Sequence, residues 1–128
     1  MRIGTELAPL EQSSVGFFDV LSNGASLANL HLTNVAVYGK LTGDWDRPFV
    51  GGLVGGSLGM GKNARIDHCS VAGGIVSAEG RQWAYGGGLT ASLYLDAYLT
   101  NSWTDVTVQV KSANGLCSAG GLVATNSN

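Results

Sequence analysis

A Gly-Gly-Leu triplet recurs along this chain and limits its fold more than any other pattern in it. Complete copies begin at Gly51, Gly87 and Gly120, which are 36 and 33 residues apart, and a degenerate copy begins at Gly16. Periods of about 20–50 residues are typical of repeat proteins, in which each unit stacks on its neighbours. The spacing therefore predicts one domain of stacked units that begin near residues 16, 51, 87 and 120.

Aligning the four copies sorts the surrounding residues into two faces of a strand, because successive strand side chains point to opposite sides. One face is apolar or lacks a side chain in every copy, and we expect it to point inward: Gly16, Gly51, Gly87 and Gly120; Phe18, Leu53, Leu89 and Leu122; Val20, Gly55, Ala91 and Ala124. The opposite face is mixed and includes Asp19 and Thr90.

Two further segments follow each of the first three triplet copies in the sequence. The first opens with Leu27, Ile66 and Leu99, and the second covers residues 35–37, 74–76 and 106–110, with a drift of about one residue that predicts a β-bulge. Three short strands in each unit describe one coil of a parallel β-helix. The main rival is an antiparallel sandwich or barrel, but the copies match by position as well as by strand count, which favours the solenoid.

Composition is consistent with a packed domain and argues against several other classes. The 128 residues are 45% hydrophobic and only 12% charged, so the chain can bury a core. A net charge of −2 argues against nucleic-acid binding by charge, and no stretch approaches the roughly 20 apolar residues of a membrane span. Residues 1–10 lack the apolar run of a signal peptide. Localisation therefore stays open from composition alone.

The two ends of the repeat array need separate treatment. Residues 1–14 are expected to be an N-terminal cap or lead-in to a β-helix domain of residues 15–128; Ile3, Leu7 and Leu10 are spaced like one helical face, and Pro9 limits any helix to a turn or two. The fourth unit has only begun when the sequence reaches Ala124. We expect self-association into a homo-oligomer through this uncapped C-terminal coil, or a longer parent chain, unless the polar tail shields the edge.

Residues 49–55, Phe-Val-Gly-Gly-Leu-Val-Gly, together with residues 64–73 resemble the GLUG repeat of large bacterial surface proteins. Residues 16–18 and 27–37 are similar to the unit that commonly leads into such repeats, and the resemblance covers about residues 15–123. The repeats correspond to a short β-helix of about three to four coils. The resemblance implies that this parallel β-helix is right-handed and belongs to an adhesin-like protein at the bacterial cell surface or secreted. It further implies a stalk or binding surface rather than a catalyst.

A loop ahead of the second triplet and its counterpart one unit later supply the candidate site. Trp45 and Trp83 occupy corresponding loops of adjacent coils, so we expect them near each other on one edge. Aromatic rings stack on sugars while charged side chains bind the hydroxyls. The candidate ligand-binding residues, for carbohydrate or protein, are Asp44, Trp45, Asp46, Arg47, Glu79, Arg81 and Trp83. The plainer interpretation is that these loop residues only solvate the coil.

Catalysis is the second hypothesis. Glycoside hydrolysis needs two carboxylates flanking one bond, yet no aligned column pairs two acids. A β-helix polysaccharide lyase or glycoside hydrolase would therefore draw its acids from Asp44, Asp46 and Glu79. We therefore expect no enzymatic activity and no cofactor. We also expect no metal, since Asp44 and Asp46 provide only two of the six to eight oxygen ligands that Ca²⁺ takes.

The histidines and cysteines are expected to be structural. His31 and His68 fall in different columns, and His68 aligns with two asparagines, Asn29 and Asn101, at a turn position. Cys69 aligns with inward residues, and Cys117 falls in another column, so a disulfide between them is not expected.

Overall fold

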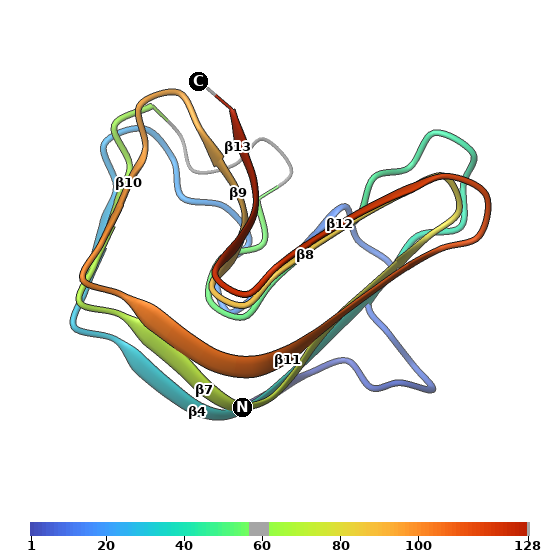
Figure 1. The fold of residues 1–128 in the computed structure, drawn as a ribbon, viewed down its shortest axis with the longest axis horizontal. Helices are drawn as coiled ribbons and strands as arrows, with labels where there is room; N and C mark the ends of the chain where they lie inside the picture. The colour runs from blue at the N-terminus through green and yellow to red at the C-terminus, as the bar shows by residue number, and fades with distance from the viewer. Residues whose placement is uncertain (57–61, 128) are drawn as a thin grey trace.

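In a computed structural model, which describes residues 1–56 and 62–127, the chain winds into a parallel β-solenoid of about four turns (Figure 1). The first turn contains β1 (Arg2–Ile3), β2 (Ser14–Val15) and β3 (Ser26–Ala28), and the second contains β4 (His31–Lys40), β5 (Phe49–Gly51) and β6 (Arg65–Asp67). The third contains β7 (Ser70–Gly80), β8 (Trp83–Gly87), β9 (Thr90–Tyr94) and β10 (Tyr98–Thr100), and the fourth contains β11 (Trp103–Ser112), β12 (Leu116–Gly120) and β13 (Val123–Ser127). A helix long and apolar enough to cross a bilayer is not found in the described ranges.

Four sheets run along the solenoid, and each takes one strand from successive turns. Their orders are β1-β4-β7-β11, β2-β5-β8-β12, β3-β6-β10 and β9-β13. Every strand pairing among the described residues is parallel, which excludes the antiparallel sandwich and confirms the expected all-β solenoid. Figure 1 looks down the stack, so that β4, β7 and β11 overlie one another in the view.

The strand registers confirm the alignment of the repeats. Gly87 pairs with Gly51 on one side and with Gly120 on the other. Ile66 likewise lies between Leu27 and Leu99. The drift in the third segment is also confirmed, because the register between β7 and β11 shifts by one residue after Asp105, at the predicted bulge.

The alignment of the first unit was wrong by one residue. Phe18 was expected beside Leu53, but it bridges Val54, although Val15 pairs with Val50 as the alignment requires. The first turn therefore has one residue fewer between these two pairings. Val20, which was expected to point inward, is 42% exposed as a result.

Strict alternation around the triplet was also wrong, because the chain bends there. Leu53 and Val54 are adjacent, yet both are fully buried. A Cβ atom on Gly51 would overlap the carbonyl of Val54, and one on Gly87 would overlap that of Thr90. The first glycine of each triplet therefore faces the inside of a tight bend, visible where β8 gives way to β9 in Figure 1, and not the core.

The second glycine of the triplet is required by the neighbouring turn. A Cβ on Gly52 would overlap the carbonyl oxygen of Gly88, and a Cβ on Gly88 would overlap the carbonyl oxygen of Gly121. Nothing in the described part of the chain lies within 4 Å of a Cβ on Gly121, which belongs to the outermost turn. Stacking, rather than local conformation, explains this column.

The core is a stack of aliphatic side chains inside the second and third turns. Fully buried side chains that fill it include Val35, Val37, Val50, Leu53, Ile66, Val71, Val76 and Leu89. In the fourth turn, by contrast, none of residues 101–127 is buried, and Val106, Val110 and Leu122 are only partly covered against the core. The outer face of β11–β13 is thus less covered than the inner turns.

Residues 1–14 contain no helical turn; they complete the first turn of the solenoid. Ile3 pairs with Val37, and Leu10 bridges Gly39. The Ala36 N–H at the edge of β4 donates to Met1 O at 2.8 Å, so the N-terminal residues pair with main-chain groups that a free strand edge would leave unpaired. Leu7 is 98% exposed, so the apolar spacing that suggested a helical face does not reflect burial.

Candidate ligand-binding site

The structure brings Trp45 and Trp83 together, as the alignment predicted. Their rings stack with centroids 6.0 Å apart and planes inclined by 30°. Trp45 lies in the loop between β4 and β5 and is 81% exposed, whereas Trp83 opens β8 and is half-buried. The two turns thus present a solvent-accessible aromatic pair at one edge.

Two arginines flank this pair in different ways. The guanidinium carbon of Arg47 lies 4.7 Å from the centroid of the Trp83 ring, within the range of a cation–π contact. Arg81 instead forms an ion pair with Asp44, with Nη1 and Oδ1 2.7 Å apart. This ion pair ties the β4–β5 loop to the turn between β7 and β8 and so positions Trp45.

The remaining two predicted residues make contacts of their own. Asp46 accepts a hydrogen bond from the Gly43 N–H at 3.0 Å, which closes the loop locally. Glu79 pairs with Lys40, its register partner across β4 and β7, at 2.7 Å. Each of the three carboxylates considered for catalysis, Asp44 included, is therefore engaged by a different partner.

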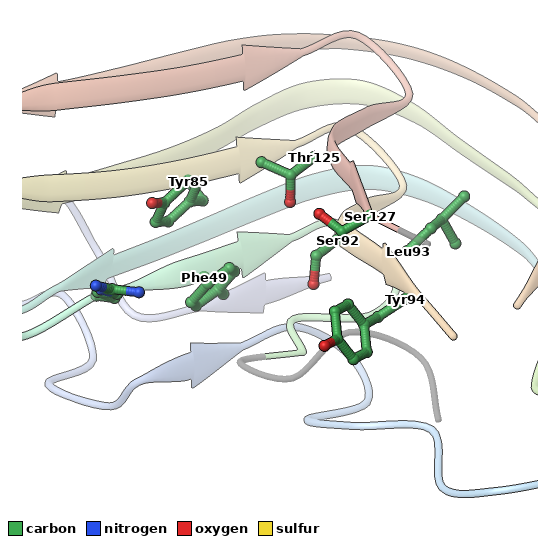
Figure 2. A pocket seen from close by; sticks show the side chains of 8 residues that line it. Phe49, Tyr85, Ser92, Leu93, Tyr94, Thr125 and Ser127 are labelled. Carbon is green, nitrogen blue, oxygen red and sulfur yellow. The ribbon is translucent and has the colours of Figure 1, made fainter. Parts of the chain in front are cut away.

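Beside the tryptophans, sequence reasoning missed a second aromatic pair and a cavity. Phe49 and Tyr85 are register partners on β5 and β8, and their rings stack at 4.5 Å with an interplanar angle of 9°. They line a cavity of about 330 Å³, shown in Figure 2, together with Arg47, Ser92, Leu93, Tyr94, Thr125 and Ser127. The chain bends at the triplets between β8 and β9, so that this half-open space lies between β5 and β8 on one side and β9 and β13 on the other.

The signal for this pair was present in the alignment. Phe49 and Tyr85 stand two residues before Gly51 and Gly87, so they occupy one column. Trp83 and Tyr85 are two residues apart on β8 and therefore share a face of the strand. We call Trp45, Trp83, Phe49 and Tyr85 the aromatic face.

Hydroxyl groups line the opposite side of the cavity. Figure 2 places Ser92, Tyr94 and Ser127 across from Phe49 and Tyr85. The Ser92 hydroxyl donates to Gly56 O at 2.9 Å, so its oxygen lone pairs remain available as acceptors. The cavity thus combines flat apolar rings with polar groups that can accept hydrogen bonds.

A cluster of polar side chains at the corner between the β3-β6-β10 sheet and the β1-β4-β7-β11 sheet is structural. The carboxylate of Asp67 accepts hydrogen bonds from Thr100 Oγ1 at 2.7 Å and Asn101 Nδ2 at 3.0 Å, and it lies 3.0 Å from His68 Nδ1. The Thr100 hydrogen bond, followed by that of Asn101, lowers the pKa of Asp67 to about 2. Asn29, His68 and Asn101 all have positive φ, of 56°, 49° and 49°, which confirms that His68 takes the asparagine position in the turn.

The other histidine and the cysteines also have defined environments. His31 Nδ1 lies 2.8 Å from Ser70 Oγ on the next turn. Cys69 is buried, Cys117 is exposed, and both are free thiols. Within residues 1–56 and 62–127, no three potential metal-ligating side chains gather at one point.

The fold and the aromatic face define the chain as a parallel β-solenoid with an exposed, partly hollowed surface of stacked rings. Comparisons with family models, curated proteins and solved structures returned no significant match.

Proposed function

We propose that this protein is a non-enzymatic adhesive module that binds carbohydrate through the aromatic face and the adjoining cavity. The observation that carries the proposal is the stacked pair Trp45 and Trp83, exposed beside the Phe49–Tyr85 pair. Large aromatic rings held at a surface offer apolar area that a ligand can cover. The resemblance to GLUG repeats supports a setting on the bacterial surface.

The chemistry of the cavity favours a sugar over a protein segment. A pyranose has an apolar face of C–H groups and a rim of hydroxyls, which suits flat rings opposed by hydroxyl oxygens. Phe49 and Tyr85 supply the rings, while Ser92, Thr125 and Ser127 supply the polar side. Ligand pockets generally pair an apolar lining with a few placed polar groups in this way.

Binding is favoured over catalysis by how the three candidate acids are used. Asp44, Asp46 and Glu79 are each engaged by a different group, namely Arg81, the Gly43 N–H and Lys40. These contacts stabilise the loop and the strand pair. Hydrolysis instead requires two acids that flank one glycosidic bond, so this use of the three carboxylates favours binding.

A glycan array read with the purified protein and three variants tests the proposal. We expect Trp45→Ala to abolish or strongly reduce binding to the glycans that the native protein retains. Trp103→Ala is the matched control, because Trp103 is also exposed, at 53%, but lies on β11. Asp44→Ala tests the enzyme hypothesis, since a catalytic acid would be needed for turnover of any bound glycan. Equal loss in the two tryptophan variants, or glycan cleavage abolished by Asp44→Ala, would contradict the proposal.

We also propose that a second copy of this chain stacks on the outer face of β11–β13. Within the described residues no strand pairs with the outer edge of β11, and Val106 and Val110 are only partly covered. A Cβ on Gly121 would meet no described atom within 4 Å, whereas Gly52 and Gly88, at the same position of their repeats, lie against a neighbouring turn. The same edge would take a further turn if the chain belongs to a longer protein.

Light scattering against concentration tests this association. The native protein should form dimers or larger species, and Gly121→Val should remain monomeric because its side chain blocks the stacking surface. A native protein that stays monomeric at millimolar concentration, or an associating Gly121→Val variant, would contradict it.

A further inference from the structure

Arg47 differs from the basic residues around it in having no carboxylate partner. Lys40 and Arg81 each form an ion pair at 2.7 Å, whereas Arg47 forms none with any described residue. It also lines the cavity, whose other lining residues are aromatic, aliphatic or hydroxyl-bearing and include no acid. The cavity therefore carries a single positive charge that the described part of the chain leaves uncompensated.

The position of this charge is fixed by the ring beneath it. The guanidinium carbon lies 4.7 Å from the Trp83 centroid, and Trp83 is in turn stacked on Trp45. A cation–π contact uses the face of the guanidinium and leaves its edge N–H donors available. Because less side-chain freedom is lost on binding, a preorganised arginine favours ligand capture.

We propose that the cavity beside Arg47 binds the carboxylate of a uronic acid unit, so that the glycan recognised by this protein is an acidic one. The inference rests on the proposed function and names its substrate class. A planar guanidinium matches a carboxylate with two parallel hydrogen bonds, which a neutral sugar hydroxymethyl group cannot form.

The remaining lining residues suit the rest of the same sugar unit. The stacked rings of Phe49 and Tyr85 can cover one face of the pyranose, and the oxygens of Ser92 and Thr125 can accept from its hydroxyls. A volume of about 330 Å³ lies at the small end of ligand pockets, so it takes a short stretch of glycan. Because Arg47 contacts Trp83 as well as the cavity, an adjoining sugar can lie against the tryptophan pair.

Calorimetric titration with matched oligosaccharides tests the assignment. The probes are tetrasaccharides of galacturonate, mannuronate and guluronate, each with its carboxyl-reduced neutral counterpart. The native protein should bind at least one uronate about tenfold or more tightly than the neutral form, as expected for a charge-assisted hydrogen bond. That preference should weaken as salt is raised.

The variants separate this inference from the proposed function. Arg47→Gln should remove the preference for the uronate while leaving weak binding to the neutral form, and Arg65→Gln, on β6 outside the cavity, should retain the preference. Equal binding of acidic and neutral forms by the native protein overturns the uronate assignment but leaves carbohydrate binding intact. Preference that survives Arg47→Gln also overturns it. Failure of all six probes to bind overturns the assignment together with the sugar-binding role for these glycans.

Discussion

Replacing Gly88 with alanine should separate the third and fourth turns, whereas the same change at Gly121 should be tolerated. A Cβ atom on Gly88 would overlap the carbonyl oxygen of Gly121 and would lie 2.8 Å from Thr104 Oγ1. The backbone φ of neither glycine is positive, so the difference between the two positions is steric. Gly121 has open space where Gly88 meets the next turn.

The magnitude follows from what the added methyl displaces. Thr104 Oγ1 donates to Gly121 O at 2.6 Å, and the Gly88 N–H donates to Gly120 O at 3.1 Å. Losing one or both costs about 0.5–1.5 kcal/mol each, and overpacking at a rigid site adds about 1–3 kcal/mol. Gly88→Ala should therefore lower the free energy of unfolding by about 1.5–6 kcal/mol. Gly121→Ala should leave it unchanged or raise it by up to about 1 kcal/mol through a less flexible unfolded chain.

Urea unfolding followed by tryptophan fluorescence measures both values. Low protein concentration keeps association out of the result, and an unchanged denaturant slope establishes that both variants report stability alone. Equal free energies of unfolding for Gly88→Ala and Gly121→Ala would contradict the stacking of the fourth turn on the third.

Further predictions concern pH, thiols, the core and the aromatic face. Because the hydrogen bond from Thr100 lowers the pKa of Asp67 from its usual value of 3.8 to about 2, the contribution of Asp67 to stability is present above about pH 4 and lost as pH falls toward 2. Unfolding of Asp67→Asn should be less pH-dependent in this range, and NMR titration of the native protein should give the low pKa directly. A thiol reagent should label exposed Cys117 in the native protein and buried Cys69 only after unfolding, as mass spectrometry can show. Ile66→Ala should cost about 2–5 kcal/mol in urea unfolding, since Ile66 is fully buried. Trp45→Ala should change stability by less than about 1 kcal/mol, because the ring is 81% exposed.

The register of the solenoid was predictable from the sequence because stacking imposes the same requirement on each turn. Gly52 and Gly88 must lack side chains for one physical reason, the carbonyl of the neighbouring turn, so they recur at matching positions. The stacking of Trp45 on Trp83 followed from the same alignment, since corresponding loops of adjacent turns lie side by side.

Features that depend on local chain direction were not predictable in this way. The bend at Gly52 and Leu53 buries neighbouring residues on both sides, which a straight strand cannot do, so a two-residue period misassigned the faces. The one-residue shift at Phe18 depends on its pairing with Val54, and the strand at Arg2–Ile3 depends on its pairing with β4. Both partners lie far away in sequence.

The cavity depends on a long-range arrangement for the same reason. Tyr85 and Ser92 lie on β8 and β9 of one turn, and only the bend between them makes them face each other. The Phe49–Tyr85 column was visible in the aligned sequence, but its role depends on what stands opposite it.

The triplets stack in parallel register from one turn to the next. The pattern of backbone nuclear Overhauser effects in the native protein tests this stacking directly. Parallel stacking should give contacts that link the amide of Leu53 to Leu89 and the amide of Leu89 to Leu122, since these N–H groups donate to the corresponding carbonyls at 2.9 and 3.0 Å. Close Hα–Hα contacts between these segments, which are typical of antiparallel pairing, would contradict it.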